Sequence, residues 1–498
     1  MSENQPPATA TSPQPPEFTP RKNGPYQRIS EELADWMRTG WADTDRGEAA
    51  PIEQADHTAK RREALSARFP GERLVVPAGH LRTRSNDTEY PFRAACDYVY
   101  LCGDQSEGAA LVFEPRAGGH DVTAYLVPRS NRQDGEFWLD GQGELWVGRR
   151  HSLAEAAQLL GVATADVRGL PEVLRAAPNV PSRIVRGQDA ALEGVLDELN
   201  KVGADETTTR DEELVVVLHD QRLVKDDWEL DQLRSAVDIT VRGFHDVVRV
   251  LPQAVATSER YIEGTFHLRA RVEGNDVGYG TIAASGPNAT TLHWMRNDGA
   301  VRPGELLLLD AGVETTTLYT ADVTRTLPIS GTFTTTQRRV YDLVLAAQDA
   351  GIAAVAPGEP VGAYHEAAQR VLAQGLIDWG LLEGPVQRVL ELGLQRRYSL
   401  HGTGHMLGLD VHDCATARTE NYRDGTLEPG MVLTVEPGLY FQPDDETVPA
   451  ELRGIGVRIE DDVCVTASGR TNLSSALPRR AEDVEAWVAE YHPDGIGA

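Results

Sequence analysis

The 498-residue chain is longer than one hydrophobic core usually supports, and its 41% hydrophobic and 25% charged residues are typical of a globular protein, so we expect two domains. The formal net charge of −28 argues against nucleic acid and against a membrane surface as partners, because both favour a basic protein face. No apolar run approaches the ~18 residues of a membrane span, and no basic and then apolar leader opens the chain, so we expect a cytoplasmic location.

The N-terminal part divides into a tail and a first domain. Residues 1–25 are rich in Pro, Thr, Ser and Gln, which predicts disorder, and 28–41 predict a helix, so 1–59 are expected to be a disordered or extended segment with a helix. Residues 60–221 predict an α/β domain. Its expected strands are 73–79, 97–103, 109–115 and 122–128, and its expected helices are 59–69, 152–160 and 189–200.

A second domain is expected over residues 222–498. Apolar residues at helical spacing predict a long amphipathic helix that begins near Asp226. Further helical patterns cover 259–273, 336–355 and 361–376, and short strand-like motifs separate them. No repeat of 20–50 residues is visible, which argues against a solenoid or a propeller.

Acidic residues end two apolar segments of this second domain. The run LLLLD predicts a buried strand that ends at Asp310, and a second strand returns with Asp322 after a Thr-rich turn. Two acids buried on neighbouring strands require protons or cations as compensation. An Asp that closes a strand is, however, more often a turn former than a metal ligand.

Histidines and two glutamates lie further along the chain. The segment SLHGTGHMLGLDVHD holds His401, His405 and His412 among three glycines, which indicates backbone packed closely around a site. A lone histidine would more often be an ordinary core or surface residue. The motifs MVLTVEPG and GVRIEDD place Glu436 and Glu460 on strands, where an exposed edge acid is the alternative. The sequence does not say which acid of EDD points inward.

Together these side chains offer four carboxylates and one imidazole, which favours a hard divalent ion: Mn²⁺ first, with Co²⁺ or Zn²⁺ possible. The four cysteines have no CxxC spacing, so a thiolate site is not expected. Four negative charges match two M²⁺ ions, which predicts a dinuclear centre with ions about 3.5–4 Å apart. A water shared by both ions would lose a proton near neutral pH and become a nucleophile.

The motifs, in this order, resemble the aminopeptidase P (Xaa-Pro aminopeptidase) family of metallopeptidases, over about residues 60–485. The resemblance implies an α/β N-terminal domain and an α+β C-terminal catalytic domain of the pita-bread fold. It implies Asp310 and Glu436 as terminal metal ligands, Asp322 and Glu460 as bridging ligands, and His405 as the imidazole ligand. Glu436 would also be the proton shuttle.

The same resemblance implies roles around the metals. His293 and His412 would line the substrate pocket and stabilise the tetrahedral intermediate, and His401, Tyr440 and Arg458 would orient ligands or substrate. Segments 84–103 and 144–150 also resemble the family. They imply that the pocket is capped by Asp87, Arg93 and Trp146. Trp146 would give the proline ring a flat wall, or it is ordinary core of the first domain.

One spacing differs from the family pattern. Asp310 and Asp322 are twelve residues apart, where the family usually has eleven. We expect the extra residue to enlarge the turn at 314–318. A shift of the strand register would instead turn Asp322 away from the site.

The resemblance implies hydrolysis of the bond between an N-terminal residue and a following proline, by a hydroxide bridging two divalent metals. The expected partners are peptides with proline at position two. The family also implies that copies of the chain associate as a dimer or tetramer. A prolidase restricted to Xaa-Pro dipeptides is the nearest alternative. A non-catalytic protein of the same fold that binds peptides or proteins is another, and a methionine aminopeptidase is disfavoured by the large N-terminal domain.

Overall fold

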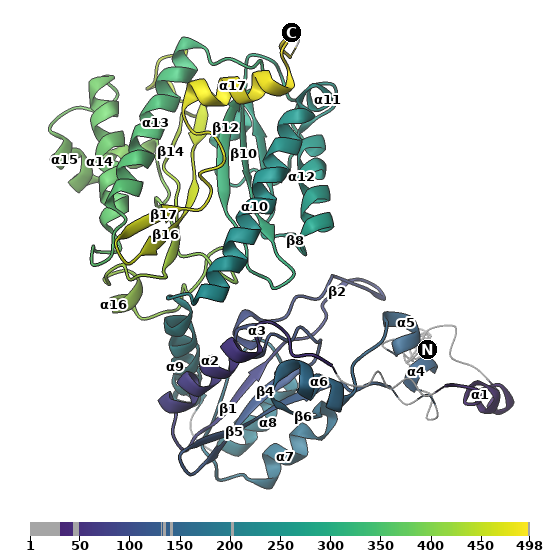
Figure 1. Cartoon of the computed structure of the whole chain (residues 1–498). Helices are drawn as coiled ribbons and strands as arrows, with labels where there is room; N and C mark the ends of the chain where they lie inside the picture. Colours follow the sequence, from purple (N-terminus) through teal and green to yellow (C-terminus); the bar gives the residue numbers. More distant parts are fainter. Residues whose placement is uncertain are drawn as a thin grey trace, which may run out of the picture.

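A computed structural model describes residues 30–42, 49–130, 132, 136–139, 143–200 and 204–496, and the disorder expected for 1–25 lies outside these residues. Figure 1 shows two bodies, one built from the first half of the chain and one from the second, which meet where α9 is followed by α10. Within the described residues, no helix combines the length and apolar character that crossing a membrane requires.

The N-terminal body is built on a mixed five-stranded sheet in the order β6-β5-β4-β1-β7. Strand β4 pairs antiparallel with β1 and β5, and the outer strands β7 and β6 add parallel to them. Its strands are β1 Arg73–Pro77, β4 Ala110–Arg116, β5 Gly119–Leu126, β6 Ala163–Asp166 and β7 Ser182–Ile184, with a hairpin of β2 Thr83–Ser85 and β3 Thr88–Glu89. Its helices are α1 Glu31–Met37, α2 Ala55–Arg68, α3 Cys96–Cys102, α4 Glu136–Leu139, α5 Glu144–Val147, α6 Leu153–Leu160, α7 Leu170–Ala176, α8 Ala190–Asn200 and α9 Ala204–Arg222.

One strand prediction for this body is wrong. Residues 97–103 were expected to form a strand, but 96–102 form α3, in which every residue is buried. A short apolar run has the same appearance in a buried helix and in a buried strand, so its pattern cannot distinguish them. Gly103 adopts the left-handed conformation (φ 74°) and its N–H bonds to the carbonyl of Val99, which ends the helix.

The C-terminal body places small antiparallel sheets between two sets of helices. Figure 1 shows α10 and α12 on one side of the strands and α13 and α14 on the other. The sheets are β12-β10-β9, β13-β16-β17, β14-β15 and β11-β8. The strands are β8 Asp276–Val277, β9 Ile282–Ser285, β10 Leu306–Ala311, β11 Val313–Glu314, β12 Val323–Pro328, β13 Val432–Val435, β14 Gly438–Tyr440, β15 Gly456–Arg458, β16 Asp461–Thr466 and β17 Gly469–Asn472. The helices are α10 Asp227–Arg249, α11 Leu251–Val255, α12 Glu259–Glu273, α13 Thr335–Ala354, α14 Ala363–Asp378, α15 Val386–Leu392, α16 Thr419–Tyr422 and α17 Ala481–Tyr491.

The junction between the bodies is a short segment with a strong helix start. The predicted limits of 60 and 222 stay predictions; α2 spans the first, and the second is the last residue of α9. The long helix expected near Asp226 is confirmed as α10. Asp226 caps it by accepting the Glu229 N–H at 2.9 Å, and Glu229 accepts the Asp226 N–H at 3.0 Å in return.

Asp226 also joins the two bodies, because it accepts from Arg61 of α2 at 2.8 Å. We expect Asp226→Ala to lower the free energy of unfolding by about 1–3 kcal/mol, through the lost cap and the lost charged hydrogen bond. The urea midpoint of unfolding measures this effect. Asp227→Ala, an exposed residue of the same first turn, is the control and should unfold like the unchanged protein.

The loss of stability in Asp226→Ala should depend on pH. Burial alone would raise the pKa of Asp226, but the hydrogen bond from the Glu229 N–H and the charge of Arg61 lower it below its usual value. A lowered pKa in the folded state gives stability that is complete above the ordinary carboxyl pKa of about 3.9 and is lost as the pH falls through the folded value. A difference in midpoint that stays constant from pH 7 to pH 3 would contradict this assignment.

Candidate metal and catalytic site

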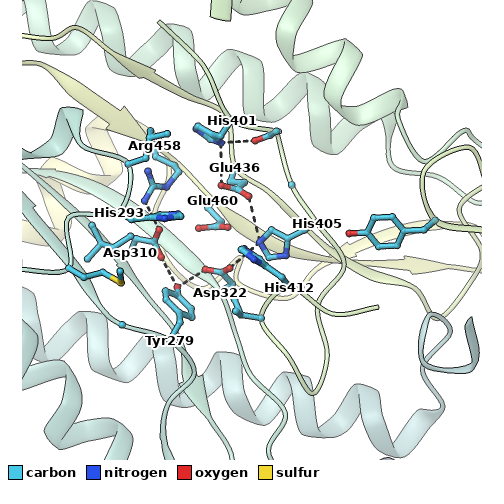
Figure 2. A pocket seen from close by; sticks show the side chains of 18 residues that line it. Tyr279, His293, Asp310, Asp322, His401, His405, His412, Glu436, Arg458 and Glu460 are labelled. Atoms are coloured by element: carbon cyan, nitrogen blue, oxygen red, sulfur yellow. Dashed lines mark hydrogen bonds and ion pairs between the residues drawn. The ribbon is translucent and has the colours of Figure 1, made fainter. Parts of the chain in front are cut away.

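A cavity of about 510 Å³ opens between the sheets of the C-terminal body. Figure 2 shows acidic and imidazole side chains from segments far apart in the sequence pointing into it. It brings together all five predicted metal ligands and four of the other predicted site residues. The ionisable side chains that line it are Tyr279, His293, Asp310, Asp322, His401, His405, His412, Tyr422, Glu436, Arg458 and Glu460.

Strand alternation explains why Asp310 points into the cavity. On β10, Leu307 and Leu309 belong to the core under the helices, whereas Leu308 packs in a small cluster with Tyr440. Side chains two residues apart on a strand share a face, so Asp310 lies on the face of Leu308. The other acids stand at strand ends, where the backbone leaves its sheet. Asp322 precedes β12, Glu436 follows β13, and Glu460 lies between β15 and β16.

Three of these side chains form a compact group of possible ligands. One ligand atom each of Asp322, His405 and Glu460 lie within 4.8 Å of one another. The Nε2 of His405 lies 3.3 Å from Asp322 Oδ2 and 3.6 Å from Glu436 Oε1. The Nδ1 of His405 is 3.1 Å from the carbonyl of Met406. With Nδ1 donating to that carbonyl, loss of the Nε2 proton would free the lone pair that a metal ligand requires.

The electrostatics of the acids favour bound cations. Burial, with a contribution from neighbouring acids, raises the pKa of Glu436 to about 7 and that of Glu460 well above its usual value. Burial also raises the pKa of Asp310, against the opposing charge of Arg458. Burial alone would lower the pKa of His405, but the hydrogen bond to Asp322 and the charge of Glu436 raise it to about 9. Positive charge is therefore stabilised at the centre of the cavity.

Neighbouring hydroxyl and guanidinium groups orient the acids. The Tyr279 hydroxyl donates to Asp310 at 2.6 Å and also to Asp322, and the Thr324 hydroxyl donates to Glu460 at 2.6 Å. Arg458 donates to Asp310 as well. Sequence reasoning did not identify Tyr279 or Thr324 as site residues. Tyr279 lies in the small-residue segment 278–298, whose composition is typical of a loop beside a pocket, and Thr324 follows Asp322 by two residues.

A second group continues the site from the acids outward. Arg458 donates to the Tyr440 hydroxyl at 2.9 Å, and that hydroxyl lies 2.8 Å from His401 Nε2. Burial and the charge of Arg458 lower the pKa of His401 to about 4, so its ring is neutral near pH 7. Its Nδ1 lies 3.6 Å from Glu436. These contacts, from Arg458 through Tyr440 and His401, link the outer part of the cavity to Glu436.

His293 and His412 lie beside the cluster. Both line the cavity, and the ring centroid of His412 is 4.3 Å from that of His405. Burial and the charge of His405 lower the pKa of His412. A neutral imidazole at this point can donate one hydrogen bond to a substrate oxygen.

The longer spacing between the two aspartates is absorbed in the turn. Asp310 stays opposite Thr324 in the β10–β12 pairing, so the register is regular. The extra length lies between Glu314 and Thr320, which form an isolated bridge, and Leu318 adopts a left-handed conformation with φ 69°. Asp322 consequently faces the cavity.

The loop that carries His412 is held by the N-terminal body. Arg93 donates to the carbonyl of Leu409 at 2.6 Å and to Glu314 at 2.6 Å. Arg222, at the end of α9, is fully buried and donates to Asp97 at 2.8 Å, to Asp410 at 3.1 Å and to Asp413. The contacts of Arg93 and Arg222 therefore position both ends of the segment 409–413.

The three residues predicted to cap the pocket are placed elsewhere. Arg93 lies at the contact between the bodies, and Asp87 lines a separate cavity of the N-terminal body, on the β2–β3 hairpin. Trp146 is 58% exposed on α5, where its indole N–H donates to the carbonyl of Trp138 at 3.1 Å. Its exposure also differs from that of an ordinary core residue. The structure thus brings none of the three to the cavity lining, and their predicted roles stay predictions.

Both parts of the chain match known protein families. Residues 231–467 match the model of Metallopeptidase family M24, and residues 58–183 match that of the Aminopeptidase P, N-terminal domain. Xaa-Pro aminopeptidase 1 of Streptomyces coelicolor is 65% identical over 98% of this chain and 99% of its own length. Xaa-Pro aminopeptidase of Escherichia coli is 34% identical over 86% of this chain and 96% of its own.

Solved structures agree with these matches. A zinc-substituted E. coli aminopeptidase P in complex with product has a TM-score of 0.79 and 31% identity, and the match covers 89% of this chain and 100% of that one. The aminopeptidase PepP of Pseudomonas aeruginosa has a TM-score of 0.78 with the same identity and the same two coverages. The predicted fold class, an α/β N-terminal domain followed by an α+β pita-bread domain, is confirmed.

The contacts of Tyr279 lead to a prediction about metal affinity. Tyr279→Phe removes the hydroxyl that orients Asp310 and Asp322, so we expect Mn²⁺ to bind roughly 10- to 100-fold more weakly in calorimetric titrations. Tyr341→Phe is the matched control, because Tyr341 is a buried tyrosine that donates to the carbonyl of Arg479 at 2.7 Å. Unchanged Mn²⁺ affinity in Tyr279→Phe would show that the acids keep their orientation without this hydroxyl.

The two possible roles of Arg93 can be separated by experiment. Arg93→Lys keeps the charge but replaces the two separate nitrogens that donate to Glu314 and Leu409 with one, so we expect the free energy of unfolding to fall by about 1–3 kcal/mol. The KM for a cleaved peptide should stay within about twofold. Arg84→Lys, an exposed arginine of β2, is the control. A KM that rises tenfold at unchanged stability would instead indicate contact with substrate, as the resemblance implied.

Proposed function

Because the chain belongs to metallopeptidase family M24 and carries the aminopeptidase P N-terminal domain, we propose that this metalloaminopeptidase cleaves the bond between an N-terminal residue and a following proline. The observation that carries the proposal is the convergence of four carboxylates and four imidazoles, His405 among them, in a single cavity. Proline has no amide proton, so an enzyme that recognises that N–H cannot bind it in the usual way. The proline preference comes from the names of the relatives.

The residues of the cavity fit divalent metal ions. Three buried acids and the half-buried Glu436 in one cavity need compensating charge, and Asp322, His405 and Glu460 already have ligand atoms close together. The ions would be held by Asp310, Asp322, Glu436 and Glu460 together with His405. Oxygen-rich ligation with one imidazole favours Mn²⁺. When bound, the two ions supply Lewis acidity and lower the pKa of water, which provides a nucleophile at neutral pH.

The protein's own side chains then act on substrate and protons. Glu436 can accept a proton at its carboxylate and deliver it to the departing proline nitrogen, because it lines the cavity beside His401 and His405. The neutral ring of His412 donates a hydrogen bond to the carbonyl oxygen of the cleaved bond as negative charge develops there. His293 lines the same cavity and can act together with it.

Tyr440, His401 and Arg458 hold the outer side of the cavity in one arrangement. The guanidinium of Arg458 fixes Asp310 and the Tyr440 hydroxyl at the same time. His401 is thereby kept beside Glu436, where it can contact the residue that follows proline. Preorganised groups of this kind reduce the entropic cost of orienting a substrate.

A panel of peptides tests the activity. With Mn²⁺ present, we expect Xaa-Pro-Yaa tripeptides to be cleaved at the first bond with kcat/KM roughly 100-fold above that of Xaa-Ala-Yaa. Cleavage confined to Xaa-Pro dipeptides would identify a prolidase, and no cleavage of any peptide would indicate a binding protein. Glu436→Gln should lower kcat at least about 100-fold. The exposed Glu428→Gln is its control and should leave kcat unchanged.

Metal analysis of the same preparations tests the ligand assignment. We expect two divalent ions per chain after Mn²⁺ loading and only one in Asp322→Asn, measured by mass spectrometry of the bound metal. Asp378→Asn, an exposed acid of α14, should still hold two. Two ions in Asp322→Asn would show that Asp322 is not a required ligand. The expectations that the chain forms a dimer or tetramer and that it is cytoplasmic both stay predictions.

A further inference from the structure

The ring of His412 has no hydrogen bond of its own to fix its direction. It packs against the ring of His405, with the centroids 4.3 Å apart (Figure 2), and no group of the described residues donates to it or accepts from it. An imidazole that is to donate to a substrate oxygen works best when its direction is fixed before the substrate binds. That direction therefore has to come from the backbone of the loop that carries His412.

The backbone of this loop closes at the residue after His412. The N–H of Asp413 donates to the carbonyl of Met406 at 2.9 Å, which joins the two ends of the loop. The N–H of Leu407 donates to the carbonyl of Val432 on β13 at 3.0 Å, which ties the first end to a strand. The second end depends on what holds Asp413.

Asp413 is held by its side chain, which is buried. Its Oδ1 accepts from Arg222 and, at 2.9 Å, from the N–H of Cys414, and its Oδ2 lies 3.6 Å from the Nζ of Lys225. Burial alone would raise the pKa of Asp413, but the charges of Arg222 and Lys225 lower it. The carboxylate is therefore ionised near neutral pH, and its position depends on the two cations.

Both cations belong to the short segment that joins the two bodies. Arg222 is the last residue of α9, and Lys225 lies two residues before the start of α10. Lys225 is 4% exposed, its N–H donates to the carbonyl of Gly430 at 2.9 Å, and its Nζ has no hydrogen-bond partner among the described residues. A Cβ atom on Gly408 would lie 2.1 Å from Asp413 Oδ2 and 3.1 Å from Lys225 Cε, so the lysine packs directly against the loop.

The energetics of this buried pair favour a role in geometry. Two charges that leave water lose their hydration, and their attraction recovers that loss poorly when hydrogen bonds are missing. The 3.6 Å contact between Lys225 and Asp413 is therefore expected to add little to the free energy of unfolding. What the two cations supply is a fixed position, since Arg222 also donates to Asp97 of the N-terminal body at 2.8 Å.

We propose that Arg222 and Lys225 position His412 for catalysis by holding the carboxylate next to it in one place. The junction between the two bodies then determines how well the carbonyl oxygen of the cleaved bond is stabilised. Neither cation is among the described residues that line the cavity, so both act through the loop. The inference rests on the proposed function, which gives His412 its hydrogen bond to that oxygen.

The test measures cleavage of an Xaa-Pro-Yaa tripeptide by the Mn²⁺-loaded full chain. Lys225→Met removes the charge at similar length, and Asp413→Asn keeps the shape of the carboxylate. We expect each to lower kcat roughly 10-fold, with KM within about twofold and two ions still bound, because a misplaced group costs mainly transition-state stabilisation. Asp211→Asn is the matched control and should leave kcat unchanged. Asp211 is a buried acid that accepts the Ile184 N–H at 3.0 Å and Arg186 at 2.6 Å.

A double-mutant cycle separates positioning from general structural support. In a His412→Ala background we expect Lys225→Met to lower kcat by less than about twofold, since the group that it positions is gone. An equal decrease in both backgrounds would overturn the proposal, and so would an unchanged kcat or the loss of a bound ion in Lys225→Met. If Asp413→Asn does not fold, the cycle with Lys225→Met decides alone.

Failure of the proposed function gives a different result. No cleavage of any peptide by the unchanged chain would overturn the proposed activity. An unchanged kcat in His412→Ala, with two ions bound, would leave the activity in place and overturn the role of His412 together with this inference.

Discussion

Burial of several carboxylates at one point is the constraint on which the catalytic body depends. Each acid alone would be destabilising away from water, and together they repel one another. The fold places them at the ends of short strands, where side chains leave the sheets without disturbing the pairing. Tyr279, Arg458 and His405 supply hydrogen bonds and positive charge around them. Divalent ions complete the compensation, so the geometry required for catalysis also stabilises the fold.

The three consecutive acids that begin with Glu460 point in different directions and have different partners. Glu460 enters the cavity, but the next residue, Asp461, is fully buried on the opposite side and paired with Arg325 at 2.7 Å. Asp462 turns back and accepts the N–H of Asp322 at 3.1 Å. Strand alternation thus sends three consecutive acids to the cavity, to an ion pair and to a backbone N–H. An uncompensated charge at any of them would be costly, since a buried acid needs a partner.

Much of this arrangement could be predicted from sequence, because local patterns determine it. The helical periodicity located α10, α12, α13 and α14 to within a few residues, and the apolar run before Asp310 identified a buried strand. The inward acid of EDD was not predictable, since it depends on where β16 starts. Helix α3 was missed for a similar reason, because a buried seven-residue apolar segment has no distinguishing period. Tyr279 was missed because its contacts with Asp310 and Asp322 join residues 31 and 43 positions apart.

The segment that carries His401 and His405 depends on close backbone packing. A Cβ atom on Gly404 would lie 2.0 Å from the carbonyl oxygen of Thr434, so only glycine lets this segment lie against β13. That packing lets His405 donate its N–H to the Thr434 hydroxyl at 3.2 Å and directs its ring to the acids. Four residues earlier, His401 lies with its Nδ1 3.6 Å from Glu436. The same contact with β13 therefore fixes the directions of His405 and of His401 at the edge of the cavity, so a backbone constraint orients two imidazoles beside the acids.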